Sequence, residues 1–80
     1  MARILLTERQ RKADLLGRNL RALQGPRTAE EMAHMIGVKS ATTWRARLNA
    51  PLTITIEELM KLGENYHIAA ADIVSRELIG

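Results

Sequence analysis

The chain has no cysteine and almost no aromatic residues: of its 80 residues one is Trp, one is Tyr and none is Phe. Without cysteine there is no disulfide framework and no thiolate metal site. With one Trp and one Tyr the chain lacks the row of aromatic side chains on which single-stranded nucleic acid stacks. These absences exclude a disulfide-stapled scaffold and argue against a single-strand binder.

Long apolar runs are also missing. No run reaches the roughly 18 residues that cross a membrane, and the N-terminus lacks the long apolar core of a secretion signal. We therefore expect a cytoplasmic protein with no membrane partner.

Residues that catalyse reactions or bind metals are sparse. His34 and His67 are the only histidines, they lie on different predicted helices, and no set of neighbouring Asp or Glu residues completes a ligand pattern, which argues against a metal site. Ser40 and Ser75 lie in no motif of an activated nucleophile, and no glycine-rich phosphate loop is present. We expect no enzymatic activity, no cofactor and no small-molecule ligand.

The net charge of +3 is unevenly distributed along the chain. Residues 1–27 carry seven cations and two anions, residues 28–50 three cations and two anions, and residues 51–80 two cations and five anions. Nine of the twelve cations are Arg, whose planar fork suits bidentate contacts to phosphate or guanine. A one-sided basic surface favours a polyanionic partner such as nucleic acid.

The pattern of caps and breakers predicts an all-α domain, a compact bundle of about five short helices spanning residues 1–80. Three Thr-x-x-Glu/Gln capping boxes, at Thr7, Thr28 and Thr55, predict helices over residues 7–24, 28–37 and 56–66. Further helices are expected over residues 40–48 and 69–78. Residues 1–6 form either a strand-like or a flexible arm.

Apolar residues at helical spacing predict the buried face of each helix. These inward positions are Leu16, Leu20 and Leu23; Met32, Ala33 and Ile36; Ile56, Leu59, Met60 and Gly63; and Ala70, Ile73 and Val74. Gly63 lowers helix stability by about 1 kcal/mol relative to Ala, which indicates a close backbone approach there.

Residues 28–48 read as a short helix, a tight turn and a second helix. Gly37 is free to adopt positive φ and end the first helix, and Val38 covers the core at the corner. The hydroxyl of Ser40 suits the N-cap of the second helix. Either Thr43 or Trp44 fills the inward position of that helix; we favour Trp44, because burial of its ring contributes far more free energy.

This segment resembles the helix-turn-helix of the lambda repressor and Cro family of phage and bacterial regulators. The resemblance rests on Thr28, Glu31, Ala33, Gly37, Val38 and Thr42, on the Arg/Leu pattern to Leu48, and on a later TIEELMKLGENYHI run that is similar to the family's fourth helix. It covers residues 16–74. It implies a lambda-repressor-like bundle whose second and third helices form the motif, with Ala33, Gly37, Val38, Trp44 and Leu48 as its core anchors.

The resemblance further implies a small, sequence-specific regulator of transcription, a phage or prophage repressor or Cro-like protein, that acts on double-stranded DNA in the nucleoid. Its recognition helix, residues 40–48, would enter the major groove. The expected base-reading residues are Lys39, Ser40, Thr42, Thr43 and Arg45. The expected phosphate contacts are Thr28, Arg47, Asn49, Arg18 and Arg21. A homodimer is expected, with a contact through the C-terminal helix at Ile73, Leu78 and Ile79.

One departure from the family pattern supports an alternative. The family often has Gln directly after the motif threonine, where it helps to fix a phosphate, and this chain has Ala29. The alternative is a protein-protein interaction module built on the same scaffold, without specific DNA binding.

Overall fold

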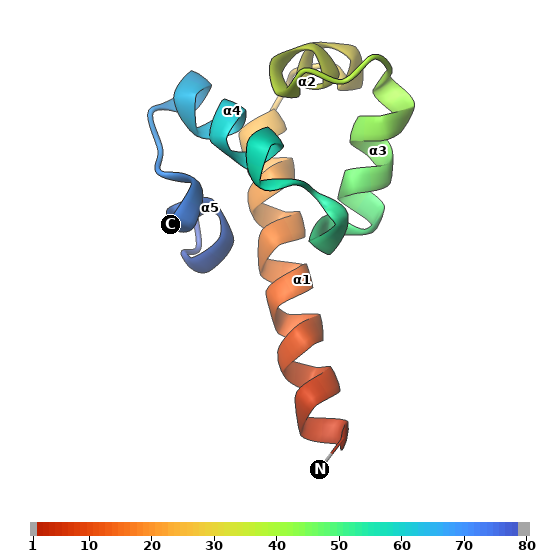
Figure 1. Cartoon of the computed structure of the whole chain (residues 1–80), viewed down its shortest axis with the longest axis vertical. Helices are drawn as coiled ribbons and strands as arrows, with labels where there is room; N and C mark the ends of the chain where they lie inside the picture. Colours follow the sequence, from red (N-terminus) through yellow and green to blue (C-terminus); the bar gives the residue numbers. More distant parts are fainter. Residues whose placement is uncertain (1, 79–80) are drawn as a thin grey trace.

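Helix α1 (Ala2–Gln24) forms the axis of the molecule, and the other helices pack around its C-terminal half (Figure 1). The structure is a computed structural model that describes the backbone of residues 2–78 and the side chains of residues 8–78. Four α-helices follow: α2 (Ala29–Ile36), α3 (Ala41–Asn49), α4 (Ile56–Tyr66) and α5 (Ala70–Ser75), with a 3-10 turn η1 (Pro51–Thr53) before α4. The predicted all-α class is confirmed.

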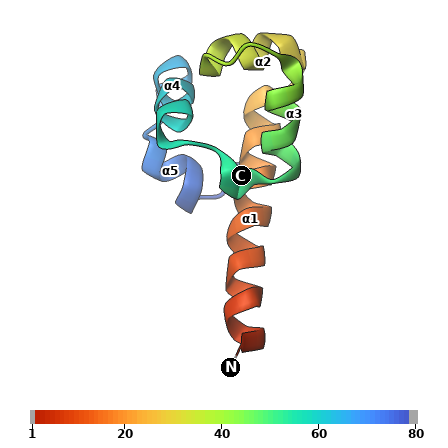
Figure 2. The same ribbon diagram turned by 45° about the vertical axis from the view of Figure 1, so that its right-hand side comes forward.

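Helix α1 starts earlier than the sequence predicted. Residues 2–6 are helical and not strand-like, and Thr7 lies within the helix instead of at its N-cap. Most residues before Gly17 are strong helix formers, so the helix continues upstream of the local capping signal. The N-terminal part of α1 extends well beyond the rest of the bundle (Figures 1 and 2).

One core joins all five helices. Its fully or nearly buried apolar residues are Leu16, Leu20, Leu23, Met32, Ala33, Ile36, Trp44, Leu59, Leu62 and Ile73. The inward stripes predicted for α1 and α2 are therefore confirmed, and so is the burial of Trp44 in α3, with Leu48 and Val38 half-buried at the edge of the core. Gly37 is exposed, so its contribution to the motif comes from its backbone conformation and not from core packing.

Two capping boxes fix where α2 and α4 begin. Thr28 Oγ1 accepts a hydrogen bond from the Glu31 N–H at 3.1 Å, and Thr55 Oγ1 accepts one from the Glu58 N–H at 3.1 Å. In each box the glutamate carboxylate accepts the N–H of the threonine in return. Both predicted starts are confirmed, and α4 has the predicted bounds.

The inward face of α4 was only partly predicted. Ile56 and Met60 were expected inside but are 74% and 53% exposed, and Leu62, which was not expected, is fully buried. The sequence offered two overlapping apolar stripes, and packing selects the one that contains Leu59 and Leu62. Gly63 is buried as predicted: a Cβ at this position would collide with the carbonyl oxygen of Ile68.

Helix α5 is shorter than the predicted 69–78, and the buried side chain of Asn19 accounts for its end. Asn19 Nδ2 donates to the carbonyls of Ile73 at 2.7 Å and Arg76 at 2.6 Å, and its Oδ1 accepts the Leu78 N–H at 3.1 Å. The helix ends at Ser75 because these groups bind Asn19 instead of continuing the helical ladder. Ile73 is buried as predicted, whereas Val74 is 38% exposed.

No helix among the described residues is long and apolar enough to cross a membrane.

Candidate nucleic-acid interface

Trp44 fixes the orientation of α3. Its side chain is fully buried, and its indole Nε1 donates to Gln24 Oε1 of α1 at 2.8 Å. Thr43 is half-buried, and its hydroxyl lies 3.4 Å from the hydroxyl of Ser40. The inward position is therefore Trp44, as we favoured, and the exposed face of α3 is the one opposite the indole.

The link from α2 to α3 turns at Gly37, which adopts the predicted left-handed conformation with φ of 79°. The N–H of Val38 then donates to the Ala33 carbonyl at 3.0 Å, which closes the end of α2. Ser40 occupies the N-cap position of α3, but its side chain makes no capping hydrogen bond, contrary to the prediction. Its hydroxyl is exposed beside that of Thr43.

The exposed surface of α3 and the link before it carries no acid of its own. It comprises Lys39, Ser40, Thr42, Arg45, Ala46 and Asn49, which we call the α3 face. Ala46 was not among the predicted contacts, because its side chain has no polar group that signals binding in the sequence. Helical geometry identifies it, since at 100° per residue it lies almost opposite Trp44, as Thr42 does.

Arg45 leans toward α2. Its guanidinium lies 3.8 Å from the carboxylate of Glu30, and the two side chains are 62% and 70% exposed. The pair lies at the edge of the α3 face, where an exposed contact contributes at most about 1 kcal/mol. Arg45 is therefore free to exchange this partner for another.

Arg47, which was expected to contact a phosphate, pairs with Glu58 of α4 instead. Its Nε donates to Glu58 Oε1 at 3.0 Å and a terminal nitrogen donates to Glu58 Oε2 at 3.2 Å. The side chains of Arg47 and Glu58 retain only 22% and 9% of their exposure. This bidentate pair holds α3 against the first turn of α4, so the Arg47 guanidinium is occupied within the fold and is not part of the phosphate-binding surface.

The charge state of Glu58 follows from this contact. Partial burial acts to raise the pKa of Glu58. This effect is outweighed by the hydrogen bonds from Arg47 and from the Thr55 N–H and by the Arg47 charge, so the pKa of Glu58 lies below the ordinary value of 4.5. Glu58 is therefore ionised at neutral pH, and the pair is charge-assisted.

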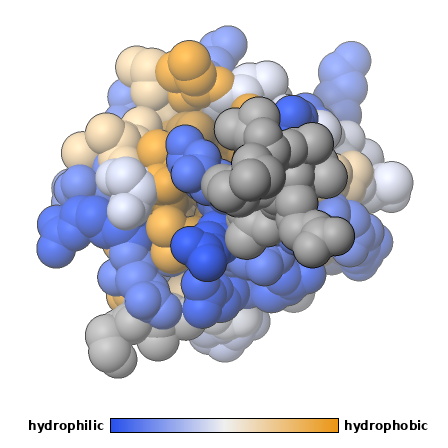
Figure 3. Space-filling model, turned by 90° about the horizontal axis from the view of Figure 1, so that it is seen from below, coloured by the Kyte–Doolittle hydropathy of each residue, from blue (hydrophilic) through white to orange (hydrophobic). Residues whose placement is uncertain are grey.

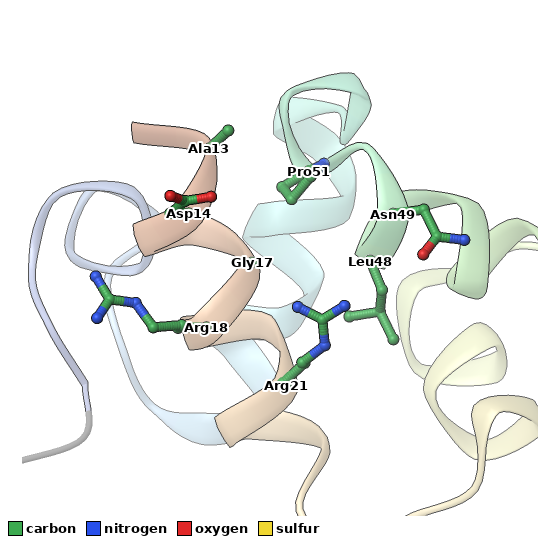
Figure 4. A pocket seen from close by; sticks show the side chains of 8 residues that line it. All are labelled: Ala13, Asp14, Gly17, Arg18, Arg21, Leu48, Asn49 and Pro51. Atoms are coloured by element: carbon green, nitrogen blue, oxygen red, sulfur yellow. The ribbon is translucent and has the colours of Figure 1, made fainter. Parts of the chain in front are cut away.

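A groove of about 550 Å³ separates α1 from the C-terminal end of α3. Arg21 reaches from α1 toward Leu48, whereas the Asn49 side chain points away from Arg21 (Figure 4); Gly17 and Pro51 also line the groove. Arg18 points away from α3 in the same view, and its guanidinium lies 3.6 Å from Glu77. Of the two predicted helix 1 contacts, the structure therefore brings only Arg21 to the α3 side.

The hydroxyl of Thr28, another predicted phosphate contact, is already engaged. It accepts the Glu31 N–H and lies 3.2 Å from the Glu31 carboxylate, so its hydrogen-bonding capacity serves the cap of α2. Thr28 is exposed beside α2, and its contribution to the site is the placement of that helix start.

Residues 8–78 contain no cluster of three or more His, Asp or Glu side chains that would hold a metal ion. The chain matches no protein-family model, no curated protein and no solved structure. The candidate site is therefore argued from its own geometry and charge.

Proposed function

We propose that this chain is a sequence-specific double-stranded DNA-binding protein that acts as a small transcriptional regulator of the lambda repressor and Cro type. The observation that carries the proposal is the α3 face: an exposed helix surface with Lys39 and Arg45 and no acid of its own, presented by a fully buried Trp44 on the opposite side. Its location would accordingly be cytoplasmic and nucleoid-associated.

The mechanism is insertion of α3 into the major groove, which is wide enough to admit one helix. Arg45 and Lys39 carry the donors that pair with guanine O6 and N7, and Thr42 suits a base edge or a thymine methyl group. Ala46, at the centre of the face, is small enough to let the helix backbone approach the bases. Ser40 and the half-buried Thr43 lie at the N-terminal end of the helix, where recognition helices contact base edges.

Affinity would come from phosphate contacts that flank α3. Arg21 lies on the α1 side of the groove and Asn49 on its α3 side, so each is placed to contact a phosphate of a duplex bound at α3. Each phosphate neutralised by a cation lowers the logarithm of the binding constant by about 0.9 per tenfold rise in salt.

The proposal includes two copies on one operator, because a domain this small makes few contacts alone. Their half-sites would lie about 34 Å apart. The dimer contact that the sequence predicted at the C-terminal helix needs correction. Ile73 is fully buried in the core and Leu78 is half-buried, while Ile79 lies outside the described residues. Apolar surface lies exposed among hydrophilic groups (Figure 3), and the large exposed apolar side chains among residues 8–78 are Leu52, Ile56, Met60 and Val74.

Selection from a random duplex DNA library tests the proposal. The winning site and a scrambled control are titrated at two salt concentrations. A partly palindromic winner bound at least about a thousandfold more tightly than the control is the expected result. No enriched sequence, with only weak and salt-sensitive binding, would refute it and leave the protein-interaction module, for which the exposed Ile56 and Met60 are the supporting observation.

A further inference from the structure

The first part of α1 extends beyond the bundle. Residues 2–12, which we call the α1 arm, project from it in both ribbon views (Figures 1 and 2), and those from Glu8 to Lys12 are exposed. The core face of α1, which is buried from Leu16 onward, continues into the arm through Lys12 and Arg9, four and seven residues earlier. Because α1 is one unbroken helix, the arm points away from the other helices of its own chain.

This continued face of the arm is basic. Arg9 and Lys12 lie three residues apart on it, whereas Arg11 projects about 200° away from Arg9. Further toward the N-terminus the sequence reads Ile-Leu-Leu at residues 4–6. A helix with apolar and basic residues binds best to a surface that is apolar and acidic.

Helix α4 presents a surface of that kind. Ile56 and Met60 are 74% and 53% exposed. Glu57 and Glu64 are exposed beside them, since all four positions lie within about 100° of one another around the helix. We call these four residues the α4 face. Lys61, the cation of this helix, is directed instead toward the end of α2.

A groove adjoins the α4 face. It has a volume of about 280 Å³ and lies between α4 and the start of α5, with Met60, Glu64, Ile68 and Ala70 among its lining residues. A helix laid on the α4 face therefore has a hollow into which an apolar side chain fits.

We propose that the α1 arm of one copy binds the α4 face of a second copy, and that the second copy returns the same contact. Such a reciprocal exchange closes a twofold dimer. Arg9 and Lys12 of each copy face the acids of the α4 face of the other. Helix α3 lies on the opposite side of α1 from α4 and α5 (Figures 1 and 2), so this dimer leaves the α3 face uncovered.

Charge identifies the occupant as a second copy. Residues 1–27 carry a net charge of +5 and residues 51–80 one of −3, so the two ends of the chain attract each other between copies. Each chain has one arm and one α4 face, and two copies cover both at once. Each contact joins one short helix to another, so we expect a weak dimer with a dissociation constant on the order of 1 to 100 μM.

As the dimer of a DNA-binding protein this inference rests on the proposed function, but it is tested without DNA, so that either can fail alone. Sedimentation equilibrium at about 0.1 M salt measures the dissociation constant of the full chain. The arm variant combines Arg9→Glu with Lys12→Glu, and the α4 variant combines Glu57→Lys with Glu64→Lys. Circular dichroism melting checks that each variant is folded.

The matched control combines Arg11→Glu with Arg18→Glu. It changes the net charge by the same amount as the arm variant, on exposed positions of the same helix that lie away from the core face. A general effect of net charge on association would therefore appear in both variants, whereas loss of the proposed contact appears only in the arm variant.

We expect the arm variant and the α4 variant each to raise the dissociation constant at least about tenfold. Four ion pairs per dimer change from attraction to repulsion, at about 1.4-fold or more each way. An equimolar mixture of the two variants should return to the wild-type dissociation constant, because both contacts of the mixed dimer again join opposite charges. The control should stay within about threefold of wild type.

The opposite results overturn the inference. A wild-type chain that is monomeric at about 200 μM, a dimer that neither variant weakens, or a mixture that stays dissociated would refute the exchange of arms. An arm variant that dimerises like wild type but lowers the salt slope of DNA binding would make Arg9 and Lys12 phosphate contacts instead. If the mixture restores the dimer but no duplex sequence is selected, the proposed function is refuted and the contact stands.

Discussion

The contact between Arg47 and Glu58 gives the sharpest prediction about stability. Arg47→Met keeps the apolar stem of the side chain but leaves the nearly buried Glu58 carboxylate with Thr55 as its remaining partner. Loss of one partner of a fully buried pair costs about 3 to 5 kcal/mol, and loss of an exposed pair costs at most about 1 kcal/mol. Because Arg47 retains 22% exposure, we expect a loss of about 2 kcal/mol.

For a domain of this size such a loss lowers the melting temperature by about 8 to 16 °C. Urea denaturation at pH 7 measures the free energy of unfolding. The matched control is Arg76→Met, whose partner Asp72 lies 3.8 Å away in an exposed pair, and its cost should stay within about 0.5 kcal/mol.

The pH dependence checks the cause of the loss. The pKa of Glu58 is lowered in the folded state, so its contribution is fully present above the ordinary value of 4.5 and is lost as pH falls through the lower folded value. The stability difference between wild type and Arg47→Met should therefore be constant from pH 7 to about pH 5 and shrink below pH 4.5.

The same variant distinguishes a structural role from a DNA contact. If Arg47 holds α3 against α4, the salt slope of DNA binding stays at the wild-type value. Unchanged stability together with a slope reduced by about 0.9 would refute this reasoning and return Arg47 to the phosphate contacts.

Three further substitutions test the core and the α3 face. Trp44→Ala should cost about 3 to 5 kcal/mol in urea denaturation, because the fully buried indole anchors α3; intact stability with lost DNA binding would place the ring at the interface instead. Asn19→Ala should cost about 1 to 3 kcal/mol, since it leaves the buried Ile73 carbonyl without its partner, and faster hydrogen exchange at Leu78 should accompany the loss. Arg45→Ala should lower affinity for the selected duplex by about 1 to 3 kcal/mol and relax the preference at one base pair in a repeated selection; equal losses on selected and scrambled DNA would remove Arg45 from base recognition.

The sequence predicted well those features that depend on a few neighbouring residues. The starts of α2 and α4 follow from two Thr-x-x-Glu boxes, whose hydrogen bonds join residues three apart. Gly37 ends α2 because of its own backbone freedom. The choice of Trp44 over Thr43 rested on burial free energy, which differs so much between the two side chains that no detail of packing was needed.

The features that sequence analysis missed depend on contacts between distant residues. Asn19 ends α5 through hydrogen bonds to residues more than 50 positions away, and nothing near Asn19 in the chain signals these partners. Ile56 and Met60 form as regular an apolar stripe as Leu59 and Leu62, so periodicity alone does not select the buried one. Packing against the other helices makes that choice.

The two arginines of α3 show why a list of cations does not amount to a binding site. Arg45 and Arg47 are two residues apart and so project about 200° apart on the helix, the first toward the start of α2 and the second toward the start of α4. Both helices begin with the pattern Thr-x-Glu-Glu, so each arginine meets a glutamate. At α2 this is Glu30, which lies outside the capping box and leaves Arg45 in a long, exposed pair. At α4 it is Glu58, which belongs to the box and holds Arg47 with two hydrogen bonds. Because one glutamate is fixed by its own backbone contact and the other is not, Arg47 is committed to the fold, and Arg45 is the arginine that remains available to a partner.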